Sequence, residues 1–399
     1  MKIFFLAATF YGLVTPVFTM DFGAAIGGSV TAENNKGIST KATLTPWFSL
    51  PLDNADFFVS LGVTAELSQK VLGIPELYRL EFSWRPAASL IIRAGRIPWM
   101  DTTHFTAKGN FDGVDLRYDW GTMRFGISVL YTGLLYRETA DINASPTDPV
   151  DYYAPLDYAD FANTYFSPRR VITALYGEFP SLVLERGDLY AGLLAQFDLS
   201  GADEAFHTQY FLLRYIHIYK QFDFSAAAAL QLENTIASGI KTGYAFALEA
   251  GWNMQAPLFI KDRLFMSVRF ASGNGPSTAA FFPVVREAQG IALRPGFSGI
   301  MIVRANYEAR IKPGLSADVG TCYFIRTDST SFAPNAITDN SYFVGAEIDA
   351  SVLWVPFSDL SFSFNGGVFF RKPEEPFLPV QNLSGRFTWA PYFPFKGRK

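Results

Sequence analysis

The side chains with the clearest capacity for chemistry in this chain are arginines and carboxylates that recur mainly at alternate positions. Alternate side chains of a β-strand lie on the same face, so each segment presents charges of both signs together. Guanidinium groups bind carboxylates and phosphates through paired hydrogen bonds. The densest group is Arg79, Glu81, Arg85, Arg93, Asp115, Arg117, Asp119 and Arg124. A second group is Arg269, Arg304, Glu308, Arg310 and Asp318.

Motifs for catalysis are missing from the sequence. The three histidines, His104, His207 and His217, are far apart, and there is no Gly-x-Ser-x-Gly, His-Glu-x-x-His or phosphate-loop motif. The single cysteine, Cys322, allows neither an internal disulfide nor a cysteine-rich zinc site. We therefore expect no enzymatic activity, no cofactor and no metal site.

The composition is unusual for a chain that is surrounded by water. Hydrophobic residues make up 49% of the 399 residues and aromatic residues 16%, whereas charged residues make up only 18%. Soluble domains have roughly 25% charged residues, so part of this surface is expected to avoid water. The net charge of -4 argues against a nucleic-acid partner, because nucleic acids attract basic patches.

The first residues have the pattern of an export signal. Lys2 precedes the apolar run "IFFLAATFYGLV", and the pattern changes near Thr19 and Met20. A charged start followed by a short apolar core is typical of a cleaved secretory peptide, so residues 1–20 are predicted to be one. No later run of 18 apolar residues is present, so no transmembrane helix is expected.

The charged residues belong to segments with a strict period of two. In "LYRLEFSWRP" (77–86), Tyr78, Leu80, Phe82 and Trp84 share one parity, and the charged side chains share the other. Such segments recur after residue 20 and predict about 18 β-strands of roughly ten residues, enough to cross a tilted bilayer span. The number 16 also remains open, because "SPRRVITALYGEF" and "HTQYFLLRYIHIYK" alternate less regularly.

The connections between these segments alternate between short and long. Those after even-numbered strands are compact, such as "RPAA" (85–88) and "KPG" (312–314). Nearly all long ones follow odd-numbered strands, including residues 138–166 and 276–296. The exceptions are "NNKG" (34–37) and "QAPLFIKD" (255–262). This alternation is typical of outer-membrane barrels, with short periplasmic turns and long outer loops, and not of β-sandwiches.

Lipid is therefore the expected solvent of the apolar face. Every backbone N–H and C=O group in hydrocarbon needs a partner, so the strands must close into a barrel. The prediction is an all-β chain, a transmembrane antiparallel up-and-down β-barrel over residues 21–395. Its charged face would surround water, because a barrel of this size is too wide for side chains to fill. The expected interfacial girdle residues are Trp47, Trp84, Trp99, Trp120, Trp252, Trp354 and Trp389, although Trp47 has the polar parity.

The chain resembles bacterial outer-membrane β-barrel proteins of the porin and substrate-specific channel type. The local order in "IIRAGRIPWM…GNFDGVDLRYDWG" is also similar to segments of alginate-export-like barrels. The end, "RFTWAPYFPFKGRK", resembles the aromatic C-terminal strand that barrel-assembly machinery recognises, but a basic extension, residues 396–399, follows Phe395. The resemblance implies a channel in the bacterial outer membrane for passive diffusion of small hydrophilic solutes, with homo-oligomers possible.

Several alternatives stay open at this stage. The charged residues either line the pore and act at its constriction, or pair across strands and keep the wall hydrated. The long segments 138–166 and 276–296 either fold into the lumen or cap the outer surface. An outer-surface adhesin or antigen barrel with an occluded lumen is one alternative function. A transporter of lipids or other hydrophobic solutes, with a lateral opening, is another.

Overall fold

A computed structural model describes most of the chain. The described residues are 20–33, 37–67, 71–145, 148, 150–152, 154–201, 205–235, 239–275, 278–328, 342–371, 380–390 and 392–395. The predicted export signal lies outside them except for Met20, and so does the predicted basic extension 396–399.

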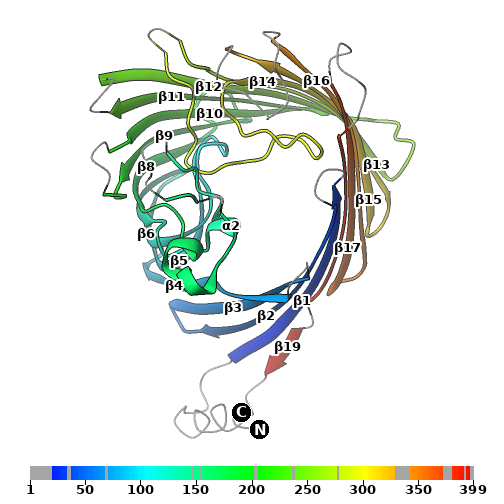
Figure 1. Cartoon of the computed structure of the whole chain (residues 1–399). Helices are drawn as coiled ribbons and strands as arrows, with labels where there is room; N and C mark the ends of the chain where they lie inside the picture. The colour runs from blue at the N-terminus through cyan, green and yellow to red at the C-terminus, as the bar shows by residue number, and fades with distance from the viewer. Residues whose placement is uncertain are drawn as a thin grey trace, which may run out of the picture.

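The described strands form one antiparallel sheet that closes on itself (Figure 1). They are Met20–Glu33 (β1), Gly37–Pro51 (β2), Ala55–Leu67 (β3), Val71–Ala87 (β4), Leu90–Met100 (β5), Lys108–Trp120 (β6), Met123–Tyr131 (β7), Arg170–Pro180 (β8), Gly187–Asp198 (β9), His207–Tyr219 (β10), Phe222–Thr235 (β11), Gly239–Asn253 (β12), Lys261–Ala271 (β13), Ile300–Lys312 (β14), Leu315–Arg326 (β15), Phe343–Phe357 (β16), Leu360–Arg371 (β17), Val380–Trp389 (β18) and Tyr392–Phe395 (β19). Each strand pairs with its neighbours in sequence order, as in an up-and-down barrel.

The first strand closes the barrel. One edge of β1 pairs with β2, and its other edge pairs with β18 and then with β19. Because β18 and β19 follow one another along the same edge of β1, they are one strand interrupted after Trp389. The barrel therefore has 18 strands, which confirms the main prediction and rules out 16.

The connections confirm that the longest loops follow odd-numbered strands, but the alternation is not strict, because three residues also separate β3 from β4 and β11 from β12. Even-numbered strands up to β16 are followed by turns such as 88–89, 121–122 and 313–314, whereas 132–169 follows β7 and 272–299 follows β13. Three short helical turns lie in the first of these long loops: Arg137–Ala140 (α2), Tyr158–Asp160 (η1) and Phe161–Tyr165 (α3). Among the residues that the structure describes, no helix is both long and apolar enough to cross a membrane.

Neighbouring side chains of a strand meet different surroundings. In β9, Leu193 is 48% exposed and faces outward, whereas Leu194 is 2% exposed and belongs to the interior. Leu213 and Leu248 are similarly exposed, while Leu212 and Ala247 next to them are buried. An apolar band that faces outward, alternating with an inner face, is the arrangement of barrels that sit in lipid.

One residue of the segment 77–86 departs from its predicted face. The register between β3 and β4 shifts at Ser60, which pairs with Arg79, while Leu61 pairs with Leu77. Tyr78 is the extra residue of this bulge. Its ring fills the space beside Gly62, where a Cβ atom would lie 2.0 Å from it, and its hydroxyl lies 3.3 Å from Oγ1 of Thr64. The bulge thus turns Tyr78 toward the inner face, because an extra residue re-aims the side chains beside it.

The predicted tryptophan girdle is present only in part. Five tryptophans are 39–66% exposed and lie near the short-turn ends of their strands: Trp84, Trp120, Trp252, Trp354 and Trp389. The prediction was wrong for the other two. Trp99 is 5% exposed and donates from Nε1 to Ser128 Oγ at 2.9 Å inside the barrel. Trp47 lies against Gly23 and stacks on Phe58, on the parity of the inner face.

Among the loops that the structure describes, three from the long-loop end enter the barrel. The described parts of 272–299 cross the interior in Figure 1 (yellow), so the inward alternative holds for 276–296. The loop 132–169 also packs inside, since Glu138 lies 3.7 Å from Lys41 of β2. With the turn 101–107, these loops form a dry core that fills part of the lumen. Phe281 and Phe297 are at most 1% exposed there.

Replacing Leu193 with arginine tests the lipid-facing parity. The charge would lie near the middle of β9 on the outer face, so we expect the barrel to lose about 2–4 kcal/mol of stability. The measurement is denaturant-induced unfolding in lipid vesicles. Ser29→Arg on the inner face of β1 is the matched control and should cost much less. Equal losses for the two variants would show that the outer face does not meet hydrocarbon.

Candidate functional site

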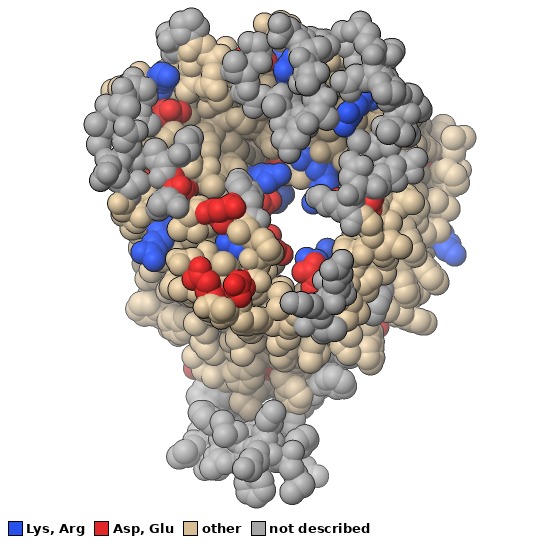
Figure 2. Space-filling view, viewed as in Figure 1, with Lys and Arg blue, Asp and Glu red and all other residues tan. Residues whose placement is uncertain are grey.

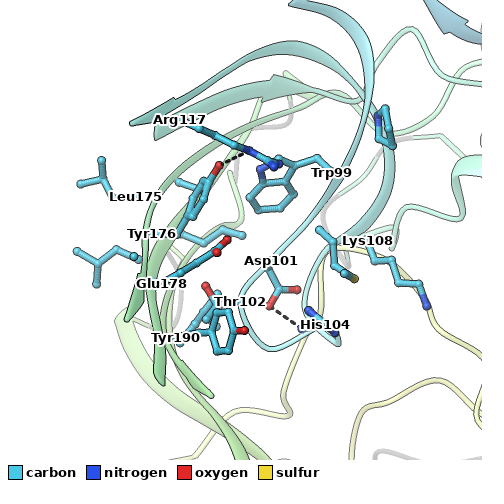
Figure 3. A pocket seen from close by; sticks show the side chains of 18 of the residues that line it. Trp99, Asp101, Thr102, His104, Lys108, Arg117, Leu175, Tyr176, Glu178 and Tyr190 are labelled. Carbon is cyan, nitrogen blue, oxygen red and sulfur yellow. Dashed lines mark hydrogen bonds between the residues drawn. The ribbon is translucent and has the colours of Figure 1, made fainter. Parts of the chain in front are cut away.

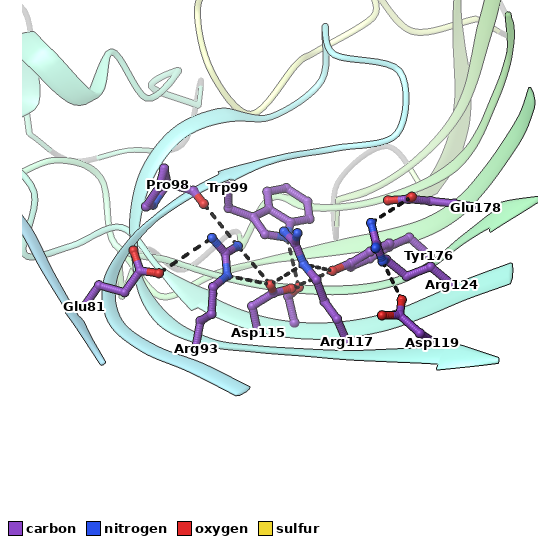
Figure 4. A network of polar contacts seen from close by, with 11 residues as sticks. Glu81, Arg93, Pro98, Trp99, Asp115, Arg117, Asp119, Arg124, Tyr176 and Glu178 are labelled. Carbon is purple, nitrogen blue, oxygen red and sulfur yellow. Dashed lines mark hydrogen bonds and ion pairs between the residues drawn. The ribbon is translucent and has the colours of Figure 1, made fainter. Parts of the chain in front are cut away.

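A buried carboxylate organises the charged residues of β5–β8 (Figure 4). Asp115 has no exposed surface and accepts from Arg93 Nη2 at 2.9 Å and from Arg117 Nε at 2.9 Å. It also accepts from the hydroxyl of Ser128 at 2.7 Å and from that of Tyr176 at 2.8 Å. Four donors from four strands therefore compensate one charge, which fixes both guanidinium groups in place.

Two further groups continue this network along the wall. Glu81 is buried and lies 2.6 Å from Nη2 of Arg79 and 3.9 Å from Nη1 of Arg93. Toward the short-turn end, Arg124 donates to Asp119 at 2.8 Å and contacts Glu178 at 3.3 Å. The predicted residues of β4–β7 are thus brought together in alternating charge, except Arg85, which is exposed at the end of β4.

The second predicted group is more dispersed. Arg269 lies 3.3 Å from Glu249, and Arg304 donates to Asp349 at 2.8 Å. Glu308 pairs with Arg263 at 3.0 Å. Arg310 is exposed near the end of β14, and Asp318 lies opposite Glu308 in the register.

Several residues of these networks were missing from the sequence-based set. They share the inner parity and a role as counter-charge or donor: Tyr176, Glu178, Asp223, Glu249, Arg263, Glu347 and Asp349. Alternation alone predicts the face of these residues, and a cation on the neighbouring strand was the additional signal that could have found the carboxylates.

The turn 101–107 is built around another buried carboxylate. Asp101 accepts from the backbone N–H groups of Thr103 (2.6 Å), His104 (3.2 Å), Thr106 (3.0 Å) and Ala107 (2.6 Å). These bonds hold His104 in a left-handed backbone conformation, with φ of 70°. Because a side chain at such a φ is strained, the carboxylate is what keeps the imidazole at this position.

His104 lies among cations. Nη1 of Arg214 is 2.6 Å from its Nδ1, and Lys108 is also close enough to act on it electrostatically. Although part of its ring is exposed, partial desolvation by the surrounding residues and these two positive charges lower the pKa of His104 to about 4. The imidazole is therefore neutral at pH 7.

The loop 272–299 is fastened at several points. Its Val284 N–H donates to the carbonyl of Thr106 at 2.8 Å, which joins it to the turn 101–107. On the other side, the buried carboxylate of Glu347 accepts from the N–H groups of Ile291 (2.6 Å) and Leu293 (2.9 Å). The loop is thus tied to opposite walls and spans part of the lumen.

A cavity of about 560 Å³ lies between the turn 101–107 and the wall (Figure 3). Trp99, Tyr176 and Tyr190 contribute rings, while Arg117 and Glu178 contribute charges of opposite sign. Such a lining offers both stacking surfaces and hydrogen bonds to a small polar solute. No cluster of three or more histidine, cysteine, aspartate or glutamate side chains suited to a metal ion occurs in the described part of the chain.

An opening persists beside the loops. Figure 2 shows a passage through the molecule, with lysine, arginine, aspartate and glutamate side chains at its edge. A second cavity, of about 540 Å³, lies between the first four strands, β18 and the loop 132–169, and both small or hydroxylated and charged residues line it. The first kind includes Ala25, Gly27, Ser29, Thr43, Thr45, Thr64 and Thr388, and the charged residues are Lys41, Glu76, Glu138 and Arg386.

Comparisons with known proteins show which solved structures share this architecture. No protein-family model matches the chain, and neither does any curated protein. The outer membrane protein OprD from Pseudomonas aeruginosa matches with a TM-score of 0.59 and 9% identity, over 95% of each chain. The structure of P. aeruginosa OpdK with vanillate matches with a TM-score of 0.62 and 11% identity, over 94% of this chain and 99% of that chain. The structure of P. aeruginosa OccD3 (OpdP) matches with a TM-score of 0.61 and 11% identity, over 94% of this chain and 91% of that chain. The chain therefore has the fold of these proteins.

The lowered pKa of His104 predicts a pH dependence of stability. The unfolded chain binds a proton at this imidazole below pH 6.5, whereas the folded chain binds it only below about pH 4. The free energy of unfolding should therefore fall as the pH decreases from about 6.5 to 4, because protonation favours the unfolded state. Denaturant titrations of the wild type and of His104→Asn at several pH values measure the contribution of His104, as the difference between their free energies of unfolding. Parallel pH profiles for the two proteins would contradict it.

Proposed function

We propose that this chain is a channel of the bacterial outer membrane that lets small hydrophilic solutes pass by diffusion. The closed 18-strand barrel with an apolar outer band supports the membrane placement. The fold shared with OprD, which is described as an outer membrane protein, supports it further. No catalytic step is part of the proposal.

The observation that carries the proposal is the passage in Figure 2. Although three of the described loops fill part of the barrel, an opening with charged side chains of both signs at its edge remains. Its charged edge favours hydrated solutes over lipids, and an adhesin with an occluded lumen would not need it.

In this channel the charged residues are proposed to line the pore and set its selectivity. Both signs alternate along the wall from β4 to β8, so a solute experiences a transverse field more than a net charge. The proposed pore-lining residues are Arg79, Glu81, Arg85, Arg93, Asp115, Arg117, Asp119, Arg124, Arg269, Arg304, Glu308 and Arg310.

Assembly and partners complete the proposal. Membrane lipid surrounds the outer face, and barrel-assembly machinery inserts the chain through its aromatic C-terminal strand. A homo-oligomer is compatible with this arrangement. The decisive experiment is single-channel recording with purified protein in planar bilayers: insertion without current would contradict the channel and support the adhesin.

Replacing Arg79, Arg85, Arg93 and Arg117 with glutamine tests the pore lining. Four positive charges leave the wall while Glu81 and Asp115 remain, so the ion preference should shift toward cations. Reversal potentials in a salt gradient measure this shift. Lys220→Gln, in a turn outside the barrel, is the control and should leave them unchanged. Unchanged potentials in the fourfold variant would place these side chains away from the constriction.

Releasing the loop 272–299 tests its role in narrowing the pore. Glu347→Ala removes both acceptors for Ile291 and Leu293. We expect larger and noisier single-channel currents, because the loop loses one of its two anchored sides. Deleting residues 280–294 should raise the conductance further, to a steady value. Conductance at or below that of the wild type in both variants would show that this loop does not limit flow.

A further inference from the structure

The short-turn end of the barrel has one sector that differs from the rest. The turn after β8 exposes Leu182, Val183 and Leu184, and the turn after β12 exposes Leu258, Phe259 and Ile260. These six apolar side chains are 43–82% exposed. A shorter turn of polar residues would be enough to connect the strands, so the exposed apolar side chains need an explanation. Together with the turn after β10 and the end of β14, they are called the rim patch here (residues 181–186, 219–221, 254–261 and 310–312).

Hydrogen bonds join the four parts of the rim patch in sequence around the barrel. The carbonyl of Arg186 accepts from Ile218 N, next to the turn after β10, at 3.3 Å, and Oε1 of Gln221 accepts from Nε2 of Gln255 at 3.4 Å. The carbonyl of Arg310 accepts from Ile260 N at 3.0 Å. The rim patch is therefore one ordered surface and not a set of separate turns.

A buried aspartate fixes the most exposed triplet. Asp262 has no exposed surface, and its carboxylate accepts from Leu258 N at 2.5 Å and from Phe259 N at 3.3 Å. This arrangement orients the turn so that Leu258 is 82% exposed. Burying the Asp262 carboxylate costs free energy, and so does exposing the apolar side chains that it holds outward. We therefore expect another molecule to cover these side chains.

Cations surround these apolar side chains. Apart from Arg310, which is proposed above to line the pore, the exposed charged residues of the rim patch are four cations and one carboxylate: Arg186, Lys220, Lys261, Lys312 and Glu185. None of these four cations forms an ion pair with another described residue, and Lys220 lies 5.2 Å from the ring centroid of Tyr219. The turns after β2 and β16 each carry one carboxylate and no cation, namely Asp53 and Asp359.

We propose that the rim patch binds anionic phospholipid in the leaflet that meets the short-turn end. The apolar triplets would lie at the boundary of the acyl chains, and the cations would contact headgroup phosphates. Trp252, an exposed girdle residue of β12, stands two residues before the turn 254–260, so the rim patch continues the lipid-facing wall. Long basic side chains suit this position because their stems lie along apolar surface while their ends reach the headgroups.

The proposal rests on the membrane placement of the barrel with its short turns toward the periplasm. It adds a lipid preference that neither the channel activity nor the fold requires. The adjoining cations and apolar residues favour an amphiphile that is anionic at one end. A periplasmic protein partner is the rival occupant, and the second experiment separates the two.

The first experiment measures lipid preference. Purified protein is equilibrated with vesicles of phosphatidylglycerol or phosphatidylcholine, and native mass spectrometry counts the retained lipids. The wild type should prefer phosphatidylglycerol, and Lys220→Gln/Lys261→Gln should weaken that preference about 25-fold, from about fivefold per cation. Arg85→Gln removes a charge at the same end outside the rim patch, and it should keep the preference. An equal loss of the phosphatidylglycerol preference in both variants, or no loss in either, would overturn the proposal.

The second experiment measures the depth of the apolar turn. Cys322 is the single cysteine and is buried, so Cys322→Ser allows a spin label on Phe259→Cys, Ser358→Cys or Leu193→Cys. In phosphatidylglycerol vesicles, the label at 259 should be more accessible to oxygen than to a water-soluble nickel chelate, and the label at 358 should show the reverse. A water-accessible label at 259 would overturn the lipid site and favour a protein partner. A water-accessible label at 193 would overturn the membrane placement itself.

Discussion

Backbone hydrogen bonding without water is the constraint on which the rest of this structure depends. In hydrocarbon an unpaired N–H or C=O group costs several kcal/mol, so no strand edge can remain open. The chain meets this constraint by pairing β1 with the second strand on one side and with the last strand on the other. The fold is therefore complete only when its two ends meet, and every inward and outward position follows from this single closed register.

Within the closed wall, buried carboxylates organise what enters the lumen. Asp115 ties two arginines to the wall, Asp101 shapes the turn 101–107, and Glu347 holds the loop 272–299. In each case one acceptor group satisfies several donors that would otherwise be buried without partners. Loops fixed in this way can fill part of a wide barrel with a dry core and still leave a defined opening beside it.

The sequence predicted the features that depend on period and parity, because each strand repeats them. Strand number, the alternation of turns and loops, and the apolar outer band follow from that repetition. It did not predict the inward turn of Tyr78, since one extra residue in β4 reverses parity locally and leaves no mark in composition. Trp99 was assigned to the girdle because a strand-end tryptophan suits an interface equally well, and only the structure, through its burial and its bond to Ser128, shows that it lies inside.

Part of the candidate site could be predicted from the sequence for the same reason. Alternation placed Arg93 and Arg117 on the charged face, but it could not identify Tyr176 or Glu178, which come from β8 after a loop of more than thirty residues. The destination of the loop 272–299 was equally hidden, because its phenylalanines fit either a dry core or an outer cap. Long-range contacts of this kind depend on strand register across the whole barrel. In the proposed channel, these long-range contacts also make the charged wall selective between solutes. Guanidinium groups that share counter-charges are fixed and keep their spacing while a solute passes.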